Sequence, residues 1–265
     1  MTPAPDMVAT NLGIYQRPAT ARWYATLSGL TSAEQAAFEL TAQAWRGGDV
    51  LDIGIGGGRT CEPLSREARS YLGIDYSGAM VAAARERYPE LDLRQGDIRD
   101  LSALPEAGFD WAFFADNGID AVDDEGRARA LREVWRVLKP GGTFVLNSHN
   151  LDCHENHWGD MLRVELAASP LETLKSVARI GVRMRNWLSS AGHRRRTERY
   201  VIKQDPGNNF ASPHYYCSGA EMRRQLAAAG FELDAVLDID GARVDEAPQR
   251  HSPTLYYIVR RPLAC

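Results

Sequence analysis

Residues 50–60 read Val-Leu-Asp-Ile-Gly-Ile-Gly-Gly-Gly-Arg-Thr, and this stretch constrains the fold more than any other part of the chain. An apolar run reaches an acid, Asp52, and then breaks into glycines at positions 54, 56, 57 and 58. Glycine has no Cβ, so such a loop can turn sharply and let a ligand lie against the main chain. A helix that begins after the loop directs free N–H groups at that ligand. The stretch therefore predicts a buried strand that ends at a ligand site, as in open α/β sheets.

The spacing of the glycines indicates which kind of ligand the loop binds. A dinucleotide fingerprint, G-x-G-x-x-G, needs a third glycine that packs the helix against the strand. Counting from Gly54, that position holds Arg59, and the pattern is instead Asp-x-Gly-x-Gly-x-Gly from Asp52 to Gly58. This form resembles the first motif of the class I S-adenosylmethionine (SAM) dependent methyltransferases. The resemblance implies that Asp52, Gly54, Gly56 and Gly58 bind the amino-acid end of SAM, with an NAD-linked oxidoreductase as the alternative.

The composition of the chain limits which classes of protein it can belong to. The chain has 265 residues, with 44% hydrophobic and 25% charged residues, as expected for one soluble α/β domain, alone or with an insertion. A formal net charge of -4 argues against a nucleic-acid binder. Four scattered cysteines without a C-x-x-C pair predict reduced thiols. Neither a signal peptide nor an apolar run of about 18 residues is evident, so we expect a cytoplasmic protein without a membrane partner.

Two further predicted strands also lead to acids. Residues 71–74 form a short apolar run that ends at Asp75, and residues 91–94 predict a strand followed by Asp97 and Ile98. An acid at the tip of the second strand accepts both ribose hydroxyls of a nucleoside, in NAD enzymes as well. In the methyltransferase family, an acid and an apolar residue after the third strand bind adenine, which implies that role for Asp97 and Ile98. The alternative is that Asp97 caps a short helix.

The resemblance extends along most of the chain. Residues 109–115 predict a strand buried on both faces, and residues 123–138 predict a helix that ends at Leu-Lys-Pro-Gly-Gly, as in the family. Strands are further predicted at 143–147, 231–239 and 255–259. The resemblance implies a Rossmann-like α/β fold whose seven-stranded, mostly parallel sheet has an antiparallel last strand and helices on both faces. It also implies cofactor contacts from Tyr76, Met80 and Asp116, although Met80 fits core packing better than contact with adenine.

Four segments follow from these elements. We expect an amino-terminal helical arm or lid at 1–48, a SAM-binding core at 49–150, a helical cap insertion at 151–214 and the rest of the core sheet at 215–265. Thr31 and Glu34 form a capping box that begins a helix over 31–46. The aromatic residues of the arm either cover the cofactor or only pack the arm onto the body. The insertion either caps the acceptor site or presents a solvated basic face.

The insertion contains one long predicted helix, at 170–190. Its apolar residues recur at helical spacing, which predicts that they face inward: Leu171, Leu174, Ala178, Val182 and Trp187.

Candidates for catalysis follow the fourth and fifth predicted strands, where the methyl group of SAM would project. Asn117 either orients a polar acceptor or is a turn amide. His149 is a candidate general base or acceptor-positioning residue, with a structural histidine as the alternative. A metal site formed by His149, Cys153, His154 and His157 is a weaker hypothesis, since the spacing matches no standard zinc pattern. We therefore expect no metal.

These observations predict a SAM-dependent methyltransferase that acts on N or O of a small molecule or short peptide and releases S-adenosylhomocysteine. Tyr15, Tyr24, His214 and Tyr215 are candidate walls of the acceptor pocket. Nucleic acid is an unexpected acceptor, because residue 117 lacks the Asn/Asp-Pro-Pro-Tyr sequence of amino-methyltransferases and no Pro-Cys nucleophile is present. An RNA methyltransferase using the arginines at 194–196 remains an alternative, as does a SAM-binding module without catalysis.

Overall fold

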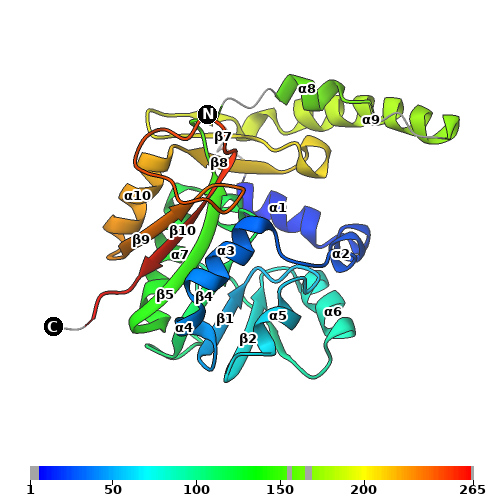
Figure 1. Ribbon diagram of the computed structural model, residues 1–265. Coiled ribbons are helices and arrows are strands. Elements are labelled where there is room, and N and C mark those ends of the chain that lie inside the picture. Colours follow the sequence, from blue (N-terminus) through cyan, green and yellow to red (C-terminus); the bar gives the residue numbers. More distant parts are fainter. Residues whose placement is uncertain (1–5, 154–156, 165–168, 264–265) are drawn as a thin grey trace.

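The chain folds around one large sheet (Figure 1), seen in a computed structural model that describes residues 6–153, 157–164 and 169–263. From one edge to the other, the sheet contains β3 (Asp92–Gln95), β2 (Ser70–Asp75), β1 (Asp49–Ile53), β4 (Phe109–Phe114), β5 (Leu138–His149), β10 (Thr254–Arg260) and β9 (Glu232–Leu237). Strand β10 is antiparallel to both neighbours, whereas β1 to β5 are mutually parallel. The expected seven-stranded, Rossmann-like fold is confirmed.

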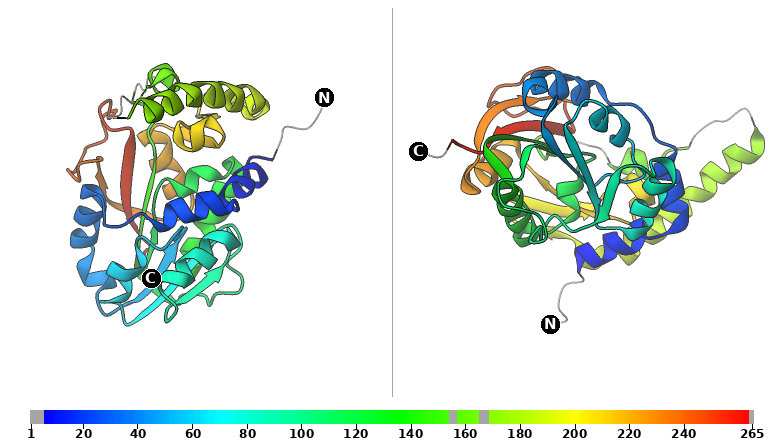
Figure 2. Two further views of the ribbon diagram at one scale, coloured as in Figure 1. Left: turned by 90° about the vertical axis from the view of Figure 1, so that its right-hand side faces the viewer. Right: turned by 90° about the horizontal axis from the view of Figure 1, so that it is seen from below.

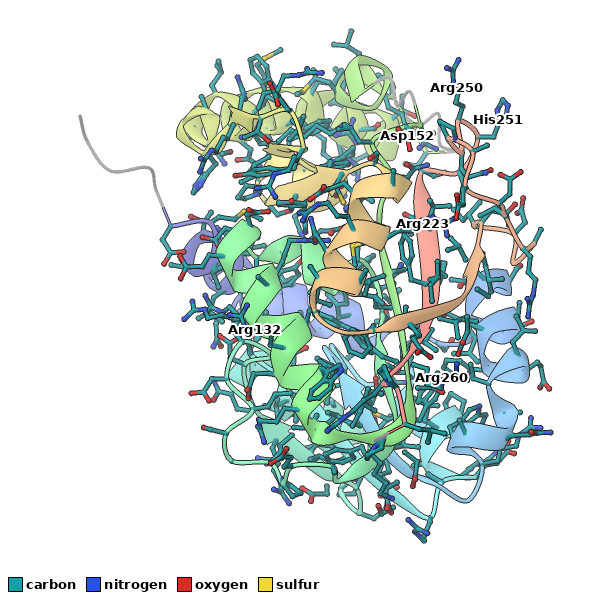
Figure 3. All side chains as sticks on the ribbon, turned by 90° about the vertical axis from the view of Figure 1, so that its left-hand side faces the viewer. Arg132, Asp152, Arg223, Arg250, His251 and Arg260 are labelled. Atoms are coloured by element: carbon teal, nitrogen blue, oxygen red, sulfur yellow. The ribbon has the colours of Figure 1, made fainter. Side chains whose placement is uncertain are left out.

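Helices cover both faces of this sheet (Figure 2). They are α3 (Ser32–Leu40), α4 (Ala42–Trp45), α5 (Cys61–Ser65), α6 (Gly78–Arg87), α7 (Asp124–Val137) and α10 (Gly219–Ala228). The amino-terminal arm adds α1 (Met7–Tyr15) and α2 (Pro18–Ala25). Figure 3 shows Arg132 of α7 and Arg260 at the end of β10, and both side chains are exposed.

Strand β4 separates two apolar cores. Trp111 and Phe113 are fully buried on one face, where both rings contact Phe38 of α3. Ala112 and Phe114 belong to the opposite core, which α7 and α10 cover. Alternate residues of a strand point to opposite faces, so a strand with two buried faces must be apolar throughout. This is why the apolar run at 111–115, which follows Asp110, identified a central strand.

The predicted helix at 31–46 is divided in two. The capping box of Thr31 and Glu34 is present, but the helix stops at Thr41, whose φ of -107° and ψ of 9° depart from helical values. The Thr41 hydroxyl donates to the carbonyl of Ala37 at 2.7 Å and accepts the indole N–H of Trp111 at 3.1 Å. A threonine hydroxyl that bonds to the preceding turn competes with regular helix geometry. The break therefore comes from a contact with β4 that local sequence does not reveal.

Strand β5 starts five residues earlier than predicted. Helix α7 ends at Val137 and the strand begins at once with Leu138, which pairs with Phe109. The next regular pair is Trp111 with Thr143, so residues 139–142 form an irregularity within the strand. Gly141 has a φ of 81°, a conformation that glycine adopts without steric cost. The Pro-Gly-Gly sequence thus ends the helix, as expected, and also forms a bulge.

The insertion contains strands as well as helices. Its elements are α8 (His157–Leu162), α9 (Pro170–Ser189), η2 (Ala191–His193), β6 (Arg195–Arg196), β7 (Tyr200–Gln204), η3 (Gly207–Phe210) and β8 (Pro213–Cys217). Strands β6, β7 and β8 form a separate antiparallel sheet. The expected boundary between 214 and 215 falls inside β8, so the helical cap continues into a small sheet that reaches residue 217. No helix in the described ranges is long and apolar enough to cross a membrane.

The inward orientation predicted for the apolar side of α9 is wrong for most of its residues. Leu171, Leu174 and Val182 are exposed, whereas Ser176 and Arg183 are buried. Sequence periodicity identifies an apolar stripe but does not show whether the stripe meets the protein.

Replacement of Trp111 by Ala is expected to lower the free energy of unfolding by about 3–5 kcal/mol, because it leaves a cavity between β4 and α3. Chemical denaturation measures this change. Trp23, which is 57% exposed, is the matched control, and Trp23→Ala is expected to change stability by no more than about 0.5 kcal/mol. Similar losses in the two variants would contradict the central role of β4.

Candidate functional site

The glycine loop after β1 is held by the tip of β2. Gly54 and Gly56 have φ values of 67° and 54°, in the left-handed region that favours glycine. The Gly56 N–H donates to Oδ2 of Asp75 at 2.9 Å, and the Ser77 N–H donates to Oδ1 of the same residue at 2.8 Å. Asp75 therefore joins the loop to the amino end of α6.

A pocket opens above this loop, at the carboxyl edge of the parallel strands. Of the residues predicted to bind cofactor or acceptor, those that line the pocket are Tyr15, Tyr24, Gly54, Gly56, Asp75, Tyr76, Met80, Asp97, Ile98 and Asp116. The sequence did not indicate the pocket residues Arg59, Phe114 and Val122. Parallel strands present their carboxyl ends at one edge, which brings these separated segments together.

Asp52 and Gly58 lie beside the pocket and do not line it. Oδ2 of Asp52 accepts hydrogen bonds from the Thr60 hydroxyl at 2.6 Å and the Tyr71 hydroxyl at 2.8 Å. Gly58 has a φ of 87°, and a Cβ there would come within 3.0 Å of the Tyr88 ring. Both residues shape the loop from beneath, and direct contact between Asp52 and the cofactor stays a prediction.

Burial raises the pKa of Asp52 and of Asp75 to about 6 in each case, against the lowering effect of their hydrogen bonds. Both groups are still mostly ionised at neutral pH. Asp97 behaves differently, because its carboxylate is bound by Arg99, with 2.6 Å between Nη2 and Oδ2. Burial alone would raise the pKa of Asp97, but the bonds from Arg99 hold it below its usual value. The pocket is thus lined by three carboxylates, Asp75, Asp97 and Asp116, of which Asp97 and Asp116 each pair with an arginine.

The amino-terminal arm packs directly on the glycine loop. A Cβ on Gly57 would lie 2.3–2.4 Å from the backbone of Tyr24 and Ala25, so only glycine permits this approach. The Arg87 guanidinium donates to the carbonyls of Gly57 at 2.8 Å and Leu27 at 3.3 Å, which fastens the arm to α6 and the loop. The geometry favours the lid interpretation over packing alone, since arm residues also line the pocket.

A buried ion pair secures the same region. Glu34 is fully buried, and its two oxygens accept from the Arg59 guanidinium at 2.6 and 2.7 Å. Arg59 also lies 3.3 Å from Oδ1 of Asp116. The residue that breaks the dinucleotide pattern therefore links the glycine loop, α3 and the end of β4.

The turn after β4 has an uncommon backbone conformation. Asp116 and Asn117 have φ values of 51° and 52°, in the left-handed region that non-glycine residues rarely occupy. The Asn117 N–H donates to the side-chain carbonyl of Asn147 at 3.0 Å, which holds the turn. The Asn117 side-chain nitrogen lies 3.4 Å from Nε2 of His149. Such conformations cost energy and concentrate at functional sites, so Asn117 stays a candidate beside the pocket.

His149 lies between two carboxylates. Its Nδ1 is 2.8 Å from Oδ2 of Asp120, and its Nε2 is 3.2 Å from Oδ2 of Asp205. Its ring stacks on Tyr216 with 4.3 Å between centroids. Asp205 belongs to the insertion, and no motif in the sequence linked Asp120 or Asp205 to this histidine. The two carboxylates complete a site that sequence reasoning found only in part.

This environment opposes a general-base role for His149. Burial disfavours the charged ring, but the hydrogen bonds to Asp120 and Asp205 dominate and raise the pKa of His149 to about 9. At neutral pH the ring is therefore an imidazolium that donates from both nitrogens. A base needs a free nitrogen lone pair, so the positioning role is the one the geometry supports.

The two predicted pocket residues of β8 face opposite ways. His214 lies beside His149, with 5.5 Å between ring centroids. The Tyr215 hydroxyl instead donates to Asp124 of α7 at 2.8 Å, on the core side. Adjacent residues of a strand point to opposite faces, so the prediction that Tyr215 walls the pocket is wrong. Tyr216, two residues after His214, shares its face. The pocket itself is not lined by His149, Asn117 or His214.

Part of the metal hypothesis lies outside the described residues. His154 lies outside the described residues, and so does the side chain of His157. Within the described ranges, no group of three or more His, Cys, Asp or Glu residues is arranged to hold a metal ion.

Comparison with known proteins identifies the fold family of this site. Residues 50–142 match the family model described as a methyltransferase domain. The chain contains a class I SAM-dependent methyltransferase domain. SAM is the cofactor of this family, as the sequence resemblance implied.

Two curated relatives share this region. The chain is 35% identical over 113 residues to a probable S-adenosylmethionine-dependent methyltransferase of Mycolicibacterium smegmatis. This alignment covers 43% of this chain and 42% of that protein. It is also 35% identical over 112 residues to a phosphatidylethanolamine N-methyltransferase of Cereibacter sphaeroides. This second alignment covers 39% of this chain and 52% of that protein. The matches thus span about half or less of each relative.

A solved structure resembles nearly the whole chain. The 1,6-didemethyltoxoflavin-N1-methyltransferase of Burkholderia thailandensis, solved with 1,6-didemethyltoxoflavin and S-adenosylhomocysteine, aligns with a TM-score of 0.58 and 14% identity. The alignment covers 96% of this chain and 88% of that one. At this identity the likeness shows the shared fold.

Replacement of Gly57 by Ala is expected to lift the arm from the loop, because the new Cβ would overlap the backbone of Tyr24 and Ala25. Trypsin should then cleave after Arg22 about tenfold faster, which corresponds to about 1.4 kcal/mol of lost docking energy. Gly13→Ala is the control, since no atom lies within 4 Å of a Cβ at that position. Equal cleavage rates in both variants would contradict the close packing.

The pKa of His149 predicts how stability depends on pH. The folded-state pKa of about 9 exceeds the unfolded value of about 6.5, so the charged ring stabilises the fold fully below pH 6.5. This contribution is lost as the pH rises through about 9. Relative to His149→Gln, the wild-type protein should lose about 3 kcal/mol of unfolding free energy across that range. Denaturation at a series of pH values measures the difference.

Proton NMR of the imidazole ring provides an independent readout, with His149→Gln to assign the resonance. A stability difference that does not change between pH 6 and 10, or a ring that titrates below about 7, would show that the carboxylates do not hold His149 in its charged form.

Proposed function

We propose that the chain is a SAM-dependent methyltransferase that transfers a methyl group to nitrogen or oxygen of a small molecule or short peptide. One observation carries the proposal: the glycine loop and Asp75 hold each other at the wall of one pocket, which Asp97 and Ile98 also line. The match of residues 50–142 to the methyltransferase domain model supports the same cofactor.

The residues of the pocket fit an adenosyl ligand. A Cβ on Gly54 would come within 2.7 Å of the Phe114 ring, so bare backbone keeps the space above the loop open. The Tyr76 hydroxyl is buried and has no hydrogen-bond partner among the described residues, which leaves it available to a ligand. In this arrangement Asp75 would hold the ribose hydroxyls, and Asp97 with Ile98 would hold the adenine.

When bound, SAM supplies a methyl group on a positively charged sulfur that is already a good leaving group. The protein's own contribution is then to position the acceptor and to keep water away, which can be worth about 7–11 kcal/mol of the barrier. Burial raises the pKa of Tyr24 to about 12 and raises the pKa of Tyr15 well above its usual value, so both phenols are neutral at the pocket wall. His149 is charged and holds Asp205 in place. An acceptor that attacks as a neutral amine suits this site, because no histidine of the described ranges lines the pocket.

The similar proteins include nitrogen and oxygen methyltransferases by name, among them a phosphatidylethanolamine N-methyltransferase and a ubiquinone biosynthesis O-methyltransferase, so both kinds of acceptor are tested. The arginines at 194–196, on which the RNA alternative rests, lie in the insertion and do not line the pocket. The pocket walls are instead largely apolar and aromatic, as expected for a small organic acceptor.

Replacement of Asp75 by Asn is expected to weaken SAM and S-adenosylhomocysteine binding by about 10- to 150-fold, since hydrogen bonds to a charged group contribute about 1.5–3 kcal/mol. Titration calorimetry measures the affinities, with NAD as the ligand that should not bind. Asp92→Asn is the matched control, because Asp92 is an exposed acid of β3 paired with Arg94. SAM should bind this variant as it binds the wild type.

Turnover is tested separately, with methyl-labelled SAM and a panel of amines, phenols and short peptides. Formation of S-adenosylhomocysteine that depends on one acceptor class would support the enzyme. Tight SAM binding with no transfer to any of them would favour a non-catalytic SAM-binding module. Absence of SAM binding in the folded wild-type protein would refute the proposal.

A further inference from the structure

Helix α9 presents an apolar side to the surroundings. Leu171, Leu174, Val177, Val182 and Leu188 are between 38% and 64% exposed. At 100° per residue these positions fall on one continuous side of the helix, about 140° wide. We call these five residues the outer stripe of α9. Scattered exposed apolar residues are ordinary, but a contiguous stripe marks an interaction site.

The opposite side of α9 attaches the helix to the protein. The Asn186 side chain donates to the carbonyl of Asn209 at 2.9 Å, and the Arg183 guanidinium donates to the carbonyl of Arg163 at 2.7 Å. The Arg194 guanidinium lies 3.7 Å from the centre of the Trp187 ring. The helix is therefore held by its polar side, and this attachment directs the outer stripe outward.

The position of α9 makes the stripe accessible to a large surface. Helices α8 and α9 lie together at one end of the molecule, and α9 extends beyond the body of the protein (Figures 1 and 2). Nothing else in the described residues covers this end. A flat surface can approach it without meeting the core sheet.

The charge of the insertion indicates which surface. Residues 163–203 contain ten Lys and Arg against three Glu, in a chain whose formal net charge is -4. Two of these basic residues, Lys175 and Arg185, are exposed and lie on α9 within or beside the outer stripe. An apolar stripe flanked by basic residues, on a helix too polar to cross a bilayer, is the pattern of helices that lie in the surface of anionic membranes.

We propose that the outer stripe of α9 docks the protein on an anionic lipid surface. Leucine and valine side chains would enter the acyl boundary, while Lys175 and Arg185 meet the phosphate groups. A second copy of the chain is a poorer occupant, because a twofold contact through this stripe would bring two strongly basic insertions together. The proposal departs from the expectation of no membrane partner, which rested on the lack of a spanning segment. It is independent of methyl transfer.

The test is flotation of the full chain with lipid vesicles, without SAM. The protein should bind vesicles of phosphatidylcholine with about 30% phosphatidylglycerol, and should bind pure phosphatidylcholine vesicles much more weakly. Raised salt should release it, because the attraction to anionic lipid is screened. The double variant Leu171→Gln with Leu174→Gln should lower the partition coefficient at least about tenfold.

Leu40→Gln is the matched control, since Leu40 is 48% exposed at the end of α3, away from the insertion. It should bind vesicles as the wild type does. The melting temperatures of all variants should agree, because the substituted residues are exposed. The double variant should also bind SAM normally, which separates this test from that of the proposed function.

Three results would overturn the proposal. One is no binding of the wild-type protein to the anionic vesicles. Another is an equal loss of binding in Leu40→Gln. The third is a concentration-dependent dimer that the double variant abolishes, since the stripe would then be an interface between two copies.

Discussion

The buried carboxylate of Asp120 is the interaction on which the site and the insertion both depend. It is fully buried in the turn after β4 and pairs with Arg127 of α7. Its oxygens also accept from the Ser148 hydroxyl at 2.7 Å and from the backbone N–H of His149 at 2.6 Å. The same carboxylate helps to keep the His149 ring protonated, and the charged ring then pairs with Asp205 of the insertion. Removal of either partner from such a buried pair leaves an uncompensated charge, which costs about 3–5 kcal/mol.

Features set by local physical rules could be predicted from the sequence. Glycines that break an apolar run, acids that follow Ile74 and Gly96, and the capping box at Thr31 each depend on residues close together in the chain. Because parallel strands end at one edge, these local features also place Asp75 and Asp97 at a common pocket. The seven strands and most of the cofactor side of the site followed from this reasoning.

The rest depends on contacts between distant segments. The direction of Tyr215 follows from strand alternation within β8, which sequence did not identify as a strand. The outward stripe of α9 follows from the polar contacts of Arg183 and Asn186 with other parts of the insertion. The charge on His149 follows from Asp120 and Asp205 together, and no motif joins either residue to the histidine. Periodicity describes one element at a time, and none of these properties belongs to one element.

The close packing of the arm on Gly57 has a consequence for exchange at the pocket. Tyr15, Tyr24 and Leu27 form part of the wall, and the backbone of the arm touches the loop that a cofactor would lie on. A large ligand that enters or leaves past this wall requires the arm to move, together with its bonds to Arg87. Exchange of the cofactor would then depend on a movement of the polypeptide, and the mobility of the amino-terminal helices would limit its rate.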